Sequence, residues 1–212
     1  MNKAVNWPEA VKPLLKKYKG KPHPLEAKNA YQYMVLVLLS AQSNDALINK
    51  LSPDLFKAYP NLQSLATALP EDLYPYITKV RNYQNKAKWL TNIAKELKKD
   101  SNIPHTMDQL VKLPGIGRKS ANVILRESGA EPEGIIVDLH VLRVAPRLGI
   151  AEGDDATKME KQLMETLPKS EWDVGMAISF LGREICRPNP QCEECLMNKV
   201  CAYYNEYVKA KA

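Results

Sequence analysis

Two residue types capable of covalent chemistry stand in the middle of this chain. The segment LPGIGRKSANV places Lys119 directly after a Gly-Ile-Gly turn, and Asp138 follows 19 residues later in VDLHV. A neutral lysine amine is a nucleophile, and a nearby carboxylate can activate it. The positive end of a helix and the adjacent Arg118 both favour the neutral amine, so we expect a lowered pKa for Lys119. Two alternatives remain open: Lys119 only binds phosphate, and Asp138 only caps the helix that it begins.

The glycine turn predicts a phosphate-binding element. A short helix capped by Thr106, the turn, and a second helix from Arg118 to Ser128 form a helix-hairpin-helix over about residues 106–128. Glycine lets the backbone adopt conformations that other residues avoid. The N–H groups of Gly115 and Gly117 and of the next helical turn can then bind phosphate. Phosphate contacts position a protein without reading base sequence, so the hairpin alone predicts affinity and not reaction.

A second cluster of reactive residues lies near the C-terminal end. Its spacing is Cys186-x5-Cys192-x2-Cys195-x5-Cys201, and it contains all four cysteines of the chain. Disulfides would normally be distributed along the sequence, so the clustering favours a metal site. Zinc and an iron–sulfur cluster both accept four thiolates. Only one close C-x2-C pair is present, which favours the cluster over zinc.

Composition favours a soluble protein with a polyanionic partner. The 212 residues are 45% hydrophobic, enough for a substantial core, and the net charge is +6 with a pI near 9.0. Basic residues concentrate in 1–28 and 79–99, which suits a phosphate-facing surface, although a solvated helix face is the alternative. No signal peptide is visible, and the longest apolar run, 33–39, is too short for a bilayer. We therefore expect no membrane contact and a cytoplasmic protein, associated with the nucleoid if the source is prokaryotic.

The elements that position these residues are predicted to be helical, since no strand-like alternation occurs. The segment 31–40 is apolar on every side and should form the buried centre of the fold. Asp155 and Ser170 are expected N-caps, and Pro146 should kink or end its helix. The predicted helices cover residues 31–40, 44–50, 53–58, 62–68, 71–78, 82–99, 106–112, 118–128, a segment that starts at 138, 155–167 and 170–185.

Taken together, four segments resemble the endonuclease III family of DNA glycosylases. They are LPGIGRKSANVIL, VDLHVLRV, the cysteine loop and LLSAQSND at residues 38–45, in the family's order over roughly residues 25–205. The resemblance implies an all-α helix-hairpin-helix glycosylase fold, in which two helical lobes flank a DNA-binding groove. Residues 28–133 would form a six-helix domain. Residues 1–27 and 134–212 would form a discontinuous domain with a C-terminal [4Fe-4S] loop.

The resemblance also implies roles for individual residues. The target nucleotide is flipped from the duplex, Lys119 attacks the sugar C1′, and Asp138 activates the lysine or stabilises the cationic sugar. A Schiff base then permits β-elimination. Gln42 matches the residue that fills the vacated space. The DNA-binding residues implied in this way are Gln42, Asn82, Tyr83, Gln84, Gly115, Gly117, Arg118 and His140. The metal ligands are Cys186, Cys192, Cys195 and Cys201.

This sequence departs from the family pattern at several positions. Leu139 stands where the family usually has threonine, and the first cysteine gap is five residues instead of six. The stretch Val80–Gln84 replaces a segment that often carries an apolar wedge, so Asn82, Tyr83 or Gln84 would do that work. Val37 stands where adenine-removing relatives have a glutamate, which disfavours that activity.

We therefore predict a monomeric, bifunctional DNA glycosylase and abasic-site lyase that removes oxidised pyrimidines from double-stranded DNA. One alternative keeps the fold but acts on alkylated or mispaired bases. The other is a non-catalytic DNA-binding protein with an iron–sulfur centre.

Overall fold

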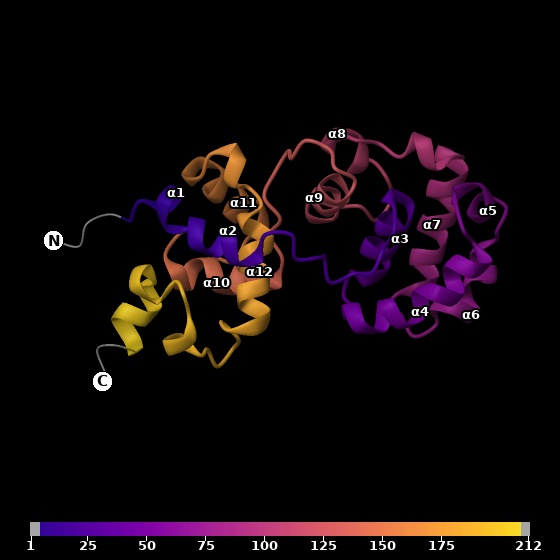
Figure 1. The fold of residues 1–212 in the computed structure, drawn as a ribbon. Helices are drawn as coiled ribbons and strands as arrows, with labels where there is room; N and C mark the ends of the chain where they lie inside the picture. The colour runs from indigo at the N-terminus through magenta and orange to yellow at the C-terminus, as the bar shows by residue number, and fades with distance from the viewer. Residues whose placement is uncertain (1–4, 209–212) are drawn as a thin grey trace. The chain divides into compact units, whose positions relative to one another are not determined.

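The computed structural model describes residues 5–208, which contain helices and turns but no strand (Figure 1). By their contacts the residues divide into two compact units. One unit is the continuous segment 22–133, and the other joins residues 1–21 to 134–212. The sequence placed the first boundary between residues 27 and 28, six residues later than this division. Each unit has its own buried core.

The 22–133 unit is built around α3 (Ala30–Ser40), as the sequence predicts. Every residue from Met34 to Leu39 is at most 2% exposed, so this helix is buried on all sides. The Asn29 side chain caps it by accepting a hydrogen bond from the backbone N–H of Gln32 at 2.9 Å. The helices α4, α7 and α9 pack against α3.

The helix α4 (Asp45–Ala58) is continuous, so the prediction of two helices separated before Pro53 is wrong. Proline lacks the N–H that would bond to the carbonyl of Asn49, four residues earlier. The hydroxyl of Ser52 donates to that carbonyl instead, at 3.0 Å. This substitute bond keeps the carbonyl satisfied and lets the helix run through the proline.

Short elements connect α4 to the long helix α7. The helix α5 (Leu62–Ala66) is followed by a 3₁₀ turn (Pro70–Leu73) and by α6 (Tyr74–Ile77), where the sequence predicted one helix over 71–78. Pro75 in the first turn of α6 cannot donate a helical bond, so the chain starts a new helix there.

The long helix α7 (Tyr83–Leu97) has the apolar face that its sequence predicts. The buried residues of this face are Ala87, Leu90, Ile93, Ala94 and Leu97.

The helix-hairpin-helix consists of α8 (Met107–Leu110) and α9 (Arg118–Glu127). Thr106 occupies the N-cap position of α8 as predicted, but its hydroxyl makes no cap hydrogen bond and donates to the side chain of Gln109 at 3.1 Å. The N–H of Met107 donates to the carboxylate of Glu133 at 3.0 Å, a residue 26 positions away. A long-range partner therefore satisfies one of the first N–H groups of this helix.

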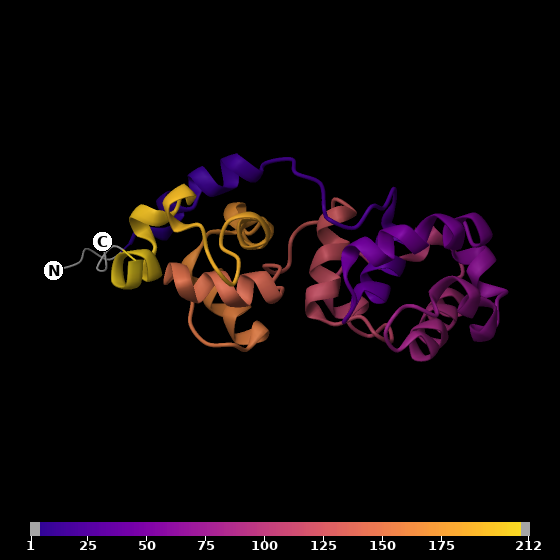
Figure 2. The ribbon, with the colours of Figure 1, turned by 90° about the horizontal axis from the view of Figure 1, so that it is seen from below.

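The other unit contains α1 (Trp7–Ala10), α2 (Lys12–Tyr18), α10 (Leu139–Leu148), α11 (Ala156–Thr166) and α12 (Val174–Glu184). The helix α12 is buried along nearly its whole length, with α10 and α2 packed against it (Figures 1 and 2). Two of its glycines allow close packing, one against the segment before α10 and one against α10 itself. A Cβ on Gly175 would lie 2.4 Å from the carbonyl oxygen of Ile136, and one on Gly182 would lie 2.9 Å from Cβ of His140.

The ends of these helices confirm some sequence predictions and correct one. The side chain of Asp155 caps α11 through the N–H of Lys158 at 2.8 Å, as predicted. Ser170 does not cap α12, because residues Lys169–Glu171 form a separate 3₁₀ turn. Pro146 lies inside α10, which ends two residues later at Leu148.

No helix in the described range is long and apolar enough to cross a membrane.

Candidate active site

The hairpin turn before α9 is shaped by Gly115. Its φ of 80° lies in the left-handed region, and a Cβ there would stand 2.5 Å from Cε3 of Trp89. The turn is closed by the N–H of Ile116, which donates to the carbonyl of Leu113 at 3.1 Å. Gly115 is therefore required both by the turn and by the tryptophan packed beneath it.

Gly117 meets a different requirement. Its φ of −95° suits any residue, so the sequence argument from backbone freedom applies to Gly115 alone. Gly117 is the N-cap residue of α9, and an added Cβ would have no atom within 4 Å. The glycine thus leaves open space at the positive end of the helix, where an anion can approach.

Lys119 lies half-buried in the first turn of α9, and Arg118 beside it is exposed. The same helix is anchored in the core by Ala121, Val123 and Ile124, each 0% exposed. The amine is therefore carried on a rigid element at the end of the hairpin.

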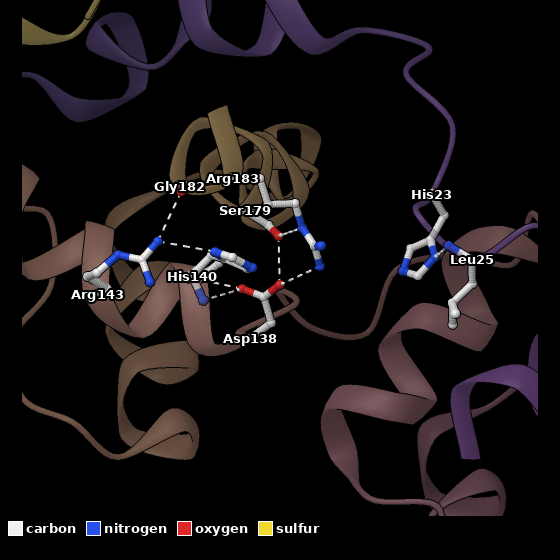
Figure 3. Close-up of polar contacts among 9 residues, drawn as sticks. His23, Leu25, Asp138, His140, Arg143, Ser179, Gly182 and Arg183 are labelled. Atoms are coloured by element: carbon white, nitrogen blue, oxygen red, sulfur yellow. Dashed lines mark hydrogen bonds and ion pairs between the residues drawn. The ribbon is translucent and has the colours of Figure 1, made fainter. Parts of the chain in front are cut away.

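Asp138 is the N-cap of α10, and its two carboxylate oxygens have different partners (Figure 3). Oδ1 accepts from the backbone N–H groups of His140 and Val141, both at 2.9 Å. Oδ2 accepts from the hydroxyl of Ser179 at 2.6 Å and lies 3.7 Å from Nη2 of Arg183. Capping, which was an alternative to a chemical role, therefore occupies only one oxygen.

His140 is oriented by Arg143 of the same helix. Nη2 of Arg143 contacts Nδ1 of His140 at 3.1 Å and also donates to the carbonyl of Gly182 at 3.0 Å (Figure 3). A guanidinium group can only donate, so Nδ1 is the acceptor and a neutral ring carries its proton on Nε2.

Leu139 lies between these two polar residues and is 79% exposed, more than any other large hydrophobic residue in the described range. The residue that departs from the family pattern is thus presented to solvent at the start of α10, next to the carboxylate.

Two turns of the 22–133 unit carry the other predicted DNA contacts. Gln42 has φ of 59° and Asn82 has φ of 58°, and both side chains are exposed. Gln84 is exposed and Tyr83 is half-buried against Tyr74, with their ring centroids 5.0 Å apart. Of this group, Tyr83 is the one held by a neighbouring ring.

The four cysteines line one small apolar cavity of about 20 Å³, beside Leu148, Leu181 and Ile185. Within the described range, no three His, Cys, Asp or Glu side chains are grouped to hold a single ion. The thiols border the cavity without converging on one point.

The chemistry of these four thiols bears on whether they can hold a metal centre. Burial raises the pKa of the thiols of Cys192, Cys195 and Cys201, and a bound cationic metal would offset that effect by stabilising thiolates. Nη1 of Arg147 lies 3.6 Å from the sulfur of Cys186. The donor set therefore fits a thiolate-bound metal centre.

The predicted residues are distributed over both units. Lys119, the hairpin glycines and the Gln42 and Asn82 turns belong to the 22–133 unit, whereas Asp138, His140 and the cysteines belong to the other. Sequence reasoning missed the contacts of Ser179 and Arg183 with Asp138, and the buried Lys86. Lys86 had a visible signal, because it is a charged residue beside the apolar face of α7.

Comparison with known proteins first identifies the superfamily to which this chain is similar. A superfamily described as "HhH-GPD superfamily base excision DNA repair protein" matches residues 35–169. The matched range includes the hairpin, Lys119, Asp138, and the turns at Gln42 and Asn82.

Individual relatives narrow this class. Endonuclease III of Bacillus subtilis is 38% identical over 178 residues, which cover 82% of this chain and 81% of that protein. Endonuclease III of Thermotoga maritima is 33% identical over 208 residues, covering 96% and 95%. A solved structure of a trapped endonuclease III–DNA covalent intermediate matches with a TM-score of 0.86 and 31% identity over 99% of this chain and 100% of that chain. The chain belongs to the endonuclease III family, which confirms the resemblance and the predicted fold class.

Proposed function

We propose that this chain excises oxidised pyrimidines from duplex DNA, with Lys119 as nucleophile and Asp138 as the carboxylate that assists it. The general activity is that of a base-excision repair DNA glycosylase with abasic-site lyase activity. The observation that carries the residue assignment is the hairpin, which ends in open space at Gly117 and presents Lys119 in the next helical turn.

The proposed reaction begins when the amine of Lys119 attacks C1′ of the flipped nucleotide. The bond from C1′ to the base breaks, and its electron pair leaves with the base. The leaving base takes up one proton from the amine. The bond from C1′ to O4′ then breaks, O4′ takes up a proton, and the lysine nitrogen and C1′ form a protonated Schiff base. Removal of a C2′ proton then expels the 3′ phosphate by β-elimination, which nicks the strand.

Asp138 suits its assisting role because its position is fixed. The helix N-terminus holds Oδ1, and Ser179 and Arg183 hold the other oxygen (Figure 3). A carboxylate fixed in this way can take a proton from the amine or stabilise positive charge on the sugar without reorganising.

DNA is the proposed partner because solved relatives are complexes with it. One is the trapped covalent intermediate, and another is a non-covalent endonuclease III–DNA complex with a TM-score of 0.85. In this chain the hairpin and His140 would bind phosphates, while the turn residues would enter the space left by the flipped nucleotide. The proposed contacts are Gly115, Gly117, Arg118, His140, Gln42, Asn82, Tyr83 and Gln84.

We also propose that Cys186, Cys192, Cys195 and Cys201 hold a [4Fe-4S] cluster. Four thiols in one loop offer one thiolate to each iron of such a cluster, and the single close C-x2-C pair favours the cluster over zinc. The cluster would crosslink the loop after α12. Metal analysis of purified protein tests this: about four iron atoms per chain are expected, and stoichiometric zinc without iron would contradict it.

Borohydride trapping tests the nucleophile. The native protein should form a covalent adduct with duplex DNA that contains thymine glycol or an abasic site, because borohydride reduces the Schiff base to a stable amine. Lys119→Ala should form none, whereas the matched control Lys57→Ala, at an exposed position on α4, should trap normally. An equal adduct yield from Lys119→Ala would refute the assignment.

Leu139 favours a second candidate substrate class, alkylated or mispaired bases, since an exposed leucine beside Asp138 replaces the usual threonine. Base-release assays over a panel of oxidised, alkylated and mispaired duplexes decide between the two. Release of oxidised pyrimidines alone excludes the second candidate.

A further inference from the structure

The fold buries one lysine that the reaction does not use. Lys86 is 3% exposed and is the only lysine buried to this degree between residues 5 and 208. It lies in the second turn of α7, next to Ala87 on the apolar face. Burying an ammonium group is unfavourable unless hydrogen bonds compensate.

The amine of Lys86 is bonded to the end of α3. Nζ donates to the carbonyl of Leu39 at 2.8 Å and to that of Ala41 at 2.5 Å. The last carbonyls of a helix have no partner within it and carry partial negative charge, so a cation is favoured there. Ala41 directly precedes Gln42, so the amine fixes the backbone from which Gln42 projects.

The backbone of Lys86 connects to the second turn. Its N–H donates to the carbonyl of Asn82 at 3.1 Å, and nearby the N–H of Arg81 donates to Oγ of Ser43 at 3.4 Å. Within the described part of the chain, the non-glycine residues with positive φ are Gln42, Asn82 and Lys98. Two of these three therefore adjoin Lys86, and such backbone strain concentrates at functional sites.

We infer that Lys86 is a positioning residue that clamps the Gln42 turn to the Asn82 turn, so that both enter the duplex as one rigid element. This inference rests on the proposed function, because the turns need a fixed spacing only if they occupy the space left by a flipped nucleotide. Displacement of a positioning group by about 1 Å can lower a rate by about a hundredfold.

The test compares duplex and single-stranded substrates with Lys86→Met, which keeps the length of the side chain but removes the amine. Single-stranded abasic DNA has no opposite strand to wedge apart, so only the duplex reaction needs the clamp. We expect borohydride trapping on duplex abasic DNA to slow about ten- to a hundredfold, while trapping on the single strand changes by less than about twofold. Lys57→Met, at an exposed position in the last turn of α4 and outside the proposed contacts, is the control and should match the native protein on both substrates.

A role in folding alone would lower both reactions equally, and a dispensable lysine would lower neither; either result overturns the inference. If Lys86→Met does not fold, Lys86→Gln replaces it in the same comparison, because its side chain is one atom shorter and uncharged and cannot hold both carbonyls as the ammonium does. Selective loss of the duplex reaction, with the single-strand reaction retained, supports the clamp in either variant.

A second measurement keeps this inference separate from the proposed chemistry. A duplex with a tetrahydrofuran abasic analogue opposite 2-aminopurine cannot react, but its fluorescence rises when the opposite base is unstacked. The native protein should raise the signal, and Lys86→Met should raise it several-fold less at saturating protein; an equal rise overturns the clamp. If the native protein traps neither abasic substrate, the proposed function fails, and this fluorescence result still decides the role of Lys86.

Discussion

The carboxylate of Asp138 combines a structural and a chemical role by dividing them between its oxygens. Oδ1 accepts the two N–H groups that begin α10, while Oδ2 faces Ser179 and Arg183. A charged group can therefore be held at a fixed position without its whole hydrogen-bonding capacity being consumed by the helix.

Two substitutions separate these roles. Asp138→Asn retains an acceptor oxygen for the cap, so the free energy of unfolding should change by less than about 1 kcal/mol, while single-turnover base release falls about a hundredfold or more. Asp138→Ala removes the cap as well and should lose about 1 kcal/mol of stability beyond Asp138→Asn. Urea unfolding and single-turnover assays measure both effects. Normal activity in Asp138→Asn would mean that the carboxylate serves only as a cap.

Lys86 should make the free energy of unfolding depend on pH in the alkaline range. Burial, with a smaller effect from the charge of Arg81, lowers the pKa of Lys86 to about 8 from its ordinary 10.5. Between these values the unfolded chain keeps a proton that the folded chain has released, so stability must rise with pH in that window. Below pH 8 both states are charged, and no further change is expected.

The measurement is the difference in unfolding free energy between the native protein and Lys86→Met. The native protein should gain on the order of 3 kcal/mol relative to the variant between pH 8 and pH 10.5. The comparison with methionine cancels the titration of other groups. If the unfolding free energies of the two proteins changed in parallel with pH over this range, the amine would titrate normally in the folded state.

At the scale of elements, the two glycines of the hairpin have separate functions, and alanine at each should have a different effect. Gly115→Ala places a Cβ against Trp89 at φ of 80°, so it should destabilise the fold by about 2–4 kcal/mol. Gly117→Ala fills only open space and should cost at most about 1 kcal/mol as a poorer N-cap.

The two variants should rank the other way for DNA binding, with Gly117→Ala weakening it more than Gly115→Ala. Gly117→Ala puts a methyl group where the phosphate approaches, so affinity for duplex DNA should fall several-fold in a protein that remains folded. Thermal unfolding and fluorescence anisotropy measure the two properties independently. Weaker binding by a well-folded Gly115→Ala together with normal binding by Gly117→Ala would reverse this assignment.

The sequence was sufficient for elements whose signals are local. The apolar residues of α3 and α7 and the cap at Asp155 are visible in a short window, and they formed as expected. Predictions were wrong where a distant or neighbouring group replaced the local one. Ser52 supports a helix through Pro53, and Glu133, not the Thr106 hydroxyl, accepts an N–H at the start of α8.

In the candidate site, too, residues with a local sequence signal were predicted and contacts between distant residues were not. Motif spacing identifies Lys119, Asp138 and the cysteines, because each motif is a continuous stretch. The contact from Ser179 to Asp138 spans 41 residues, and that from Lys86 to Ala41 spans 45. Such pairs exist only after the helices pack, so a single sequence does not reveal them.

At the scale of the whole molecule, the net charge of +6 and the hairpin suit binding through the DNA backbone. Each phosphate neutralised by a basic side chain releases counterions, so affinity should fall with salt. A basic residue in contact with phosphate therefore differs from one that only adds to the net charge, and the salt dependence distinguishes them.

Arg118→Gln and Lys57→Gln provide the comparison, because each removes one positive charge from an exposed side chain. Arg118 adjoins the hairpin, so its loss should make the slope of log affinity against log salt shallower by about 0.9. Lys57, in the last turn of α4, lies outside the proposed contacts, and its loss should leave the slope unchanged. The measurement is duplex binding between about 50 and 200 mM salt. Equal slopes for both variants and the native protein would show that the hairpin arginine does not contact phosphate, and that DNA is bound through another surface of the chain.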